Sequence, residues 1–168
     1  MYKIARFRVF ILIFFAVLIR ASFLENIKIA GIKPDIAIPI VIFSGLFGGP
    51  RLGAETGIFA GFLTDVLGIF GFGIGIISYG ICGALAGFLN KRFYKESFLT
   101  QSILTGLLTF LIYSIFYLLR LVNPGINIYA YKRPFFDQAL FIIVLYNSIL
   151  APLVFKISYS IFGFKKVH

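Results

Sequence analysis

Long apolar runs, separated by short segments that carry basic residues, dominate this 168-residue chain. Hydrophobic residues make up 60% of the sequence and charged residues only 13%, whereas soluble domains are about 45–50% apolar and about 25% charged. A water-soluble core of this size could not bury so many Phe and Ile side chains, so the lipid bilayer is the expected solvent. Runs of roughly 20 apolar residues cross a ~30 Å hydrocarbon core as helices. The pattern therefore predicts an all-α, polytopic membrane helix bundle.

The apolar runs predict a single integral membrane domain over residues 1–168 with about six transmembrane helices. The second run is short, at about 18 Å of ideal helix, so a re-entrant segment is the alternative there. The first run follows basic residues as in a signal peptide, but it lacks a small-residue cleavage site and is interpreted as a retained span. The predicted segments are residues 9–24, 36–48, 52–70, 74–90, 98–122 and 135–162.

The net charge of +10 indicates how the protein is oriented in the membrane rather than that it binds nucleic acid. In a soluble protein such a charge would suggest nucleic-acid binding, but here the basic residues cluster between the apolar runs. With six spans and a cytoplasmic N-terminus, nine of the 16 basic residues fall in cytoplasmic segments and four in outer loops. The positive-inside rule therefore predicts that both termini are cytoplasmic, and no nucleic-acid partner is expected.

Glycines recur every four residues in the third predicted segment. Gly53, Gly57 and Gly61 are followed by Asp65 at the same spacing. On a helix this spacing forms a flat, slowly spiralling groove that allows another helix backbone to approach closely. Gly83 and Gly87 repeat the spacing in the fourth segment. These glycines are predicted to pack helices within the protein, and a groove for a partner's helix is the alternative.

Several charged residues are expected to lie within or beside the bilayer. Asp65 is predicted near the outer end of its segment, at the level of Arg20 and Arg120, so an ion pair is the first interpretation. A ligand or partner contact and a proton relay are the alternatives. Glu55 follows Arg51 by four residues, a spacing that favours a salt bridge on a helix.

No recognisable catalytic or metal-binding constellation is present in the sequence. The chain has one cysteine, Cys82, and its single histidine is the terminal His168, so a zinc site with three protein ligands has nothing to build on. No Ser-His-Asp set or Gly-x-Ser-x-Gly elbow occurs. We therefore expect no catalytic residues, no cofactor and no metal, and a protein that is not an enzyme.

Several motifs follow one another in a specific order along the chain. Asp35 follows Lys33-Pro34 at the start of an apolar segment and reads as a helix N-cap. The glycine stripe with Asp65 follows, then Tyr79, the second glycine pair and the basic Lys91-Arg92. Asn147 and Pro152 lie near the end of the chain. This order of motifs resembles the bacterial MreD family of rod shape-determining proteins, in which the family-like positions are the stripe itself together with Pro34, Asp35, Asn147 and Pro152.

This resemblance implies a role that the residues alone do not. It implies an inner (cytoplasmic) membrane scaffold of the cell-elongation complex that binds MreC and supports peptidoglycan synthesis and rod shape. MreB filaments, a RodA-type glycosyltransferase, a class B penicillin-binding transpeptidase and membrane lipids are the other implied partners. It also implies a fold like that of the substrate-binding subunits of energy-coupling-factor transporters. A small-molecule- or lipid-binding subunit of the vitamin-transporter type is the alternative, although residues 9–20 lack the small-residue pattern expected for docking to such a transporter.

Overall fold

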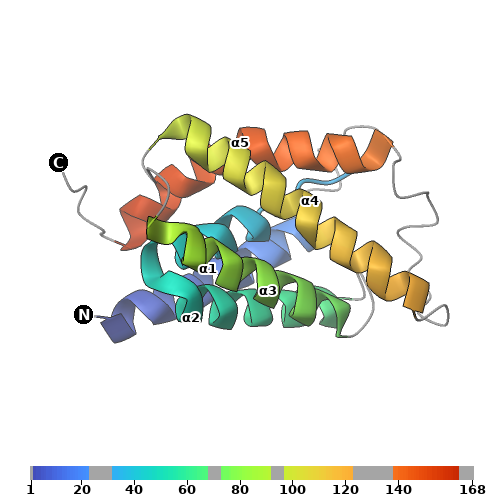
Figure 1. The fold of residues 1–168 in the computed structure, drawn as a ribbon. Coiled ribbons are helices and arrows are strands. Elements are labelled where there is room, and N and C mark those ends of the chain that lie inside the picture. Colours follow the sequence, from blue (N-terminus) through green and yellow to red (C-terminus); the bar gives the residue numbers. More distant parts are fainter. Residues whose placement is uncertain (1, 23–31, 68–72, 92–96, 123–137, 163–168) are drawn as a thin grey trace.

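The computed structural model describes residues 2–22, 32–67, 73–91, 97–122 and 138–162, and these parts are helical (Figure 1). The ends of three predicted segments, at 23–24, 68–70 and 135–137, fall outside the described residues. The elements are α1 (Tyr2–Ser22), α2 (Ala37–Val66), α3 (Ile74–Phe88), the short 3-10 helix η1 (Leu89–Lys91), α4 (Phe98–Val122) and α5 (Gln138–Phe162).

The prediction of six transmembrane helices is not supported. In the described parts of the chain, three helices are long and apolar enough, by length and composition alone, to cross a membrane: Ala37–Val66, Phe98–Leu119 and Leu140–Ile161. The α3 helix is apolar but has only 15 residues. The predicted segments 36–48 and 52–70 were expected to be two full spans; the structure has them as the two parts of α2, on either side of a break at Gly49. The all-helical membrane class is retained, and the number of spans is corrected.

The α2 helix is broken at Gly49, where φ is +84°, a value that favours glycine. Pro50 follows and cannot donate a backbone hydrogen bond to the preceding turn. The Ser44 and Thr56 hydroxyls lie in hydrogen-bond contact, although twelve residues of straight helix would separate them by about 18 Å. The chain therefore folds back at Gly49, and α2 consists of two arms, residues 37–48 and 50–66. The first arm is too short to cross a ~30 Å core unaided.

The glycine stripe packs against α3. A Cβ atom added to Gly53, Gly57 or Gly61 would lie closer than 3.0 Å to backbone atoms of α3. A Cβ at Gly83 would meet the carbonyl of Gly53, and one at Gly87 would meet the backbone of Pro50. The groove predicted from the sequence is thus filled within the molecule. It leaves no space for a helix of another protein.

Aliphatic and aromatic side chains cover the outside of the helices. On α5 they recur every four residues from Phe141 to Ile157, and on α4 they extend from Phe98 to Val122. The inward faces pack α4 chiefly on α5 and α2 on α3, and α4 crosses α5 obliquely (Figure 1). An exterior of this kind suits hydrocarbon rather than water.

The close α2–α3 contact generates a prediction. Gly57→Ala should lower the free energy of unfolding by about 1–3 kcal/mol, because the new methyl group must displace the α3 backbone at Tyr79. Gly80→Ala is the matched control, since its Cβ first meets the flexible Ile58 side chain at 3.1 Å. Thermal unfolding in detergent measures both variants. Equal stability of the two would contradict the packing role of Gly57.

Candidate functional site

Two buried carboxylates, Asp35 and Asp65, mark the candidate sites. Asp35 has no exposed surface and Asp65 is 4% exposed. A charged side chain at the centre of a membrane costs roughly 2.5–3.5 kcal/mol even on lenient scales. The partners of each carboxylate therefore decide what it can do.

Asp35 forms a buried ion pair with Arg20. Arg20, near the end of α1, donates from Nη1 to Asp35 Oδ2, and the Tyr79 hydroxyl of α3 donates to the same oxygen. Arg20 Nη1 also lies 3.5 Å from the Tyr79 hydroxyl. The Arg20 side chain is only 8% exposed. The charges of the pair thus cancel inside the protein, with a third polar group completing the contact.

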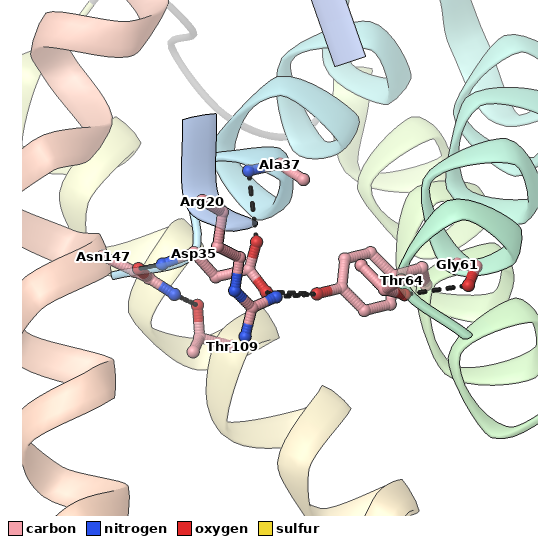
Figure 2. A network of polar contacts seen from close by, with 8 residues as sticks. Arg20, Asp35, Ala37, Gly61, Thr64, Thr109 and Asn147 are labelled. Carbon is pink, nitrogen blue, oxygen red and sulfur yellow. Dashed lines mark hydrogen bonds and ion pairs between the residues drawn. The ribbon is translucent and has the colours of Figure 1, made fainter. Parts of the chain in front are cut away.

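The other side of Asp35 is bonded to three further helices (Figure 2). Its Oδ1 accepts the Ala37 N–H of α2 at 3.2 Å, which is the contact of a helix N-cap. Its backbone N–H donates to Asn147 Oδ1 of α5 at 2.9 Å. Asn147 Nδ2 in turn lies 3.5 Å from Thr109 Oγ1 of α4. The cluster therefore joins all five α-helices through side chains or backbone groups at one point.

The chemistry available to this Asp35 cluster is limited. Both carboxylate oxygens already accept hydrogen bonds, and Asp35, Tyr79 and Asn147 are fully buried. A general acid or base must reach the group with which it exchanges a proton. The Asp35 cluster is a closed, charge-compensated junction between helices, and its geometry suits stabilisation rather than catalysis.

Asp65 has a different set of partners. Its carboxylate accepts the backbone N–H groups of Gly73 at 2.8 Å, Gly75 at 2.9 Å and Ile76 at 3.2 Å. These groups belong to the first turn of α3, whose N–H groups have no partner within the helix, and the positive end of the helix dipole favours an anion there. The structure thus corrects the expected ion pair of Asp65 with Arg20. Arg20 pairs with Asp35, and Asp65 caps α3.

The other predicted positions are distributed more simply. Glu55 Oε1 lies 3.1 Å from Arg51 Nε, so the predicted salt bridge is confirmed. Pro34 is buried beside Asp35, Pro152 lies inside α5, and the Arg120 side chain lies outside the described part of the structure. Within the residues described, no group of three or more His, Cys, Asp and Glu side chains could hold a metal ion.

Two members of the Asp35 cluster had no predicted chemical role. Tyr79 entered the sequence argument only through its place in the family pattern, and Thr109 did not enter it. Both lie on apolar helices where a single hydroxyl carries little signal. The one available clue was that Arg20 lies near the end of the first predicted segment and Asp35 just before the second, which predicts the same membrane level for the two charges.

The buried ion pair leads to a second prediction. Asp35→Asn should destabilise the protein by about 3–5 kcal/mol, because it leaves the Arg20 charge buried without its counter-ion. In an Arg20→Met background the same change should cost much less, since no buried charge is then left unpaired. Thermal unfolding in detergent of the two single variants and the double variant measures this coupling. Additive losses would show that the pair is not coupled.

The Asp65 cap leads to a third prediction. Asp65→Asn should cost about 1–2 kcal/mol, because the amide has one acceptor oxygen and its NH₂ group would face N–H donors of α3. Glu55→Gln is the matched control, an acid of the same helix whose partner, Arg51, is exposed; it should change stability by less than about 1 kcal/mol. Amide hydrogen exchange at the start of α3 should increase only in Asp65→Asn. Unchanged exchange there would contradict the capping role.

Comparison with known proteins agrees with the family pattern. The chain matches the family of the rod shape-determining protein MreD over residues 1–161, a range that includes both buried carboxylates. No curated protein and no solved structure matches it, so the expected likeness to subunits of energy-coupling-factor transporters is not supported. The family match extends over nearly the whole helical body, from α1 to the end of α5. The chain therefore belongs to the MreD family of rod shape-determining membrane proteins.

Proposed function

We propose that this protein is a non-catalytic scaffold subunit of the bacterial cell-elongation complex, that it binds MreC, and that it supports peptidoglycan synthesis. Family membership supplies the link to rod shape. The observation that carries the non-catalytic part is the Asp35 cluster, whose two carboxylate oxygens are both engaged within the protein. A RodA-type glycosyltransferase, a class B penicillin-binding transpeptidase and MreB act beside it in this proposal.

The contact with MreC, in this proposal, uses an outward-facing surface. The glycine groove is filled by α3, so a partner's segment cannot lie there without separating the two helices. The outward faces are almost entirely apolar. Association between such surfaces inside a bilayer depends on close packing and on lipid entropy rather than on the hydrophobic effect.

The proposed location is the inner membrane, with both termini in the cytoplasm. The Arg8 guanidinium donates to the Ile161 carbonyl at 3.1 Å, which brings the start of α1 and the end of α5 to the same side of the molecule. The excess of basic residues in the segments assigned to that side supports a cytoplasmic orientation. Cysteine accessibility at the two ends, in intact and in permeabilised cells, would test it.

Co-purification is the direct test of the scaffold proposal, and it gives a fourth prediction. The tagged protein, extracted from its native membrane, should retain MreC, and its depletion should convert rod-shaped cells into rounded ones. A multi-pass membrane protein of unrelated function with the same tag is the control. Purification without MreC, together with normal rod growth after depletion, would refute the proposal. Recovery of a bound vitamin instead would favour the alternative, a small-molecule-binding subunit.

The contact surface can be located with one outward-facing position on each of four helices. Alanine is placed at Phe15 of α1, Phe62 of α2, Leu107 of α4 and Ile149 of α5, which are all exposed. A variant that loses MreC while its unfolding temperature stays unchanged identifies the binding helix. Loss of MreC only in variants that are also unstable would show that these faces do not form the contact.

A further inference from the structure

The α2–α3 side of the molecule is much shorter than α4. The α3 helix has 15 residues, about 22 Å of helix, and the second arm of α2 measures about 25 Å. The α4 helix has 25 residues, about 37 Å. The hydrocarbon core of a typical bilayer is about 30 Å thick. The two sides of one protein therefore differ from the bilayer in opposite directions.

The outward residues of α2 and α3 form one continuous surface, here called the short face. Ile58 lies directly over Gly80, since its Cγ1 atom is 3.1 Å from the place of a Cβ at that glycine. This contact joins the exposed residues of α2 to those of α3. The short face consists of apolar residues that are 37–69% exposed: Ile58, Phe62, Val66, Leu67, Ile77, Ile81, Leu85 and Phe88.

No charged side chain extends the short face toward the outer headgroups. Between Glu55 and Asn90 the sequence contains one charged residue, Asp65, and its carboxylate is occupied by backbone N–H groups of α3. At the opposite end of the second arm of α2, Arg51 is largely exposed and marks where the apolar surface ends. Lysine or arginine side chains that could snorkel and lengthen the face are therefore missing from residues 56–90.

The α4 helix is longer than the hydrocarbon core, unlike the short face. Its exposed apolar side chains run from Phe98 to Val122, over about 36 Å. An overlong helix fits a bilayer by tilting. A short segment is matched by snorkelling where a basic side chain is present, as at the Arg51 end, and by thinning of the bilayer at the end of the short face that lacks one.

We propose that the short face preferentially binds bilayer lipids with short acyl chains, whereas the α4 side does not. The inference concerns the lipid around this protein, and it holds or fails independently of any contact with MreC.

The natural chain contains no tryptophan, which allows a fluorescence test at single sites. Ile81→Trp reports on the short face and Leu107→Trp on α4; both positions are exposed near the middle of their helices. Each variant is reconstituted with brominated phosphatidylcholine, which quenches tryptophan. Dimyristoleoyl- or dierucoyl-phosphatidylcholine then competes for the site, and relief of quenching gives the relative affinity for short and long chains.

We expect the short-chain lipid to be preferred by about threefold or more at Ile81→Trp, and by clearly less at Leu107→Trp. Leu85→Trp, a second position on the short face, serves if Ile81→Trp does not fold. The same chain-length order at both faces would overturn the proposal, whether it reflects a uniformly thin protein or no selectivity. A preference for long chains on the short face would also overturn it.

Discussion

The rest of the structure depends on the buried carboxylate of Asp35. It precedes the first arm of α2, binds Arg20 of α1 and Tyr79 of α3, and accepts the first N–H of its own helix, while its backbone binds Asn147 of α5. In lipid, apolar side chains give helices little preference for one another over acyl chains. A polar junction that is satisfied in only one arrangement therefore specifies how the helices assemble.

The glycine packing and the Asp35 cluster are connected through Tyr79. Gly57 allows the α3 backbone to approach at Tyr79, since a Cβ there would collide with the Tyr79 carbonyl. The hydroxyl of the same tyrosine reaches Asp35. The close contact between the α2 and α3 backbones thus fixes the position from which the Tyr79 side chain reaches the Asp35 carboxylate. At the start of α3, Asp65 fixes the helix along its axis through three N–H groups.

The sequence predicted what depends on composition and on local spacing. It predicted the all-helical membrane class, the bounds of α4 at 98–122, and the Arg51–Glu55 salt bridge, whose partners are one helical turn apart. It did not predict the partner of Asp65, because the approach of the α3 N-terminus depends on the tertiary fold. It placed a boundary between segments 36–48 and 52–70, which agrees with the break at Gly49. It expected both segments to be full spans, whereas the first arm is too short to cross alone, as in the re-entrant alternative.

The internal pairing of charges also constrains how this protein can be recognised. Among the described residues, the buried acids compensate their charge with Arg20 or with helix N–H groups, and the outward faces carry leucine, isoleucine and phenylalanine. A partner within the membrane therefore contacts apolar surfaces of defined shape and length, rather than hydrogen-bonding groups. Specificity in such a contact comes from complementary surfaces and matched apolar lengths. The difference in apolar length between the α2–α3 side and the α4 side is the feature of this protein that a partner or a lipid can most readily distinguish.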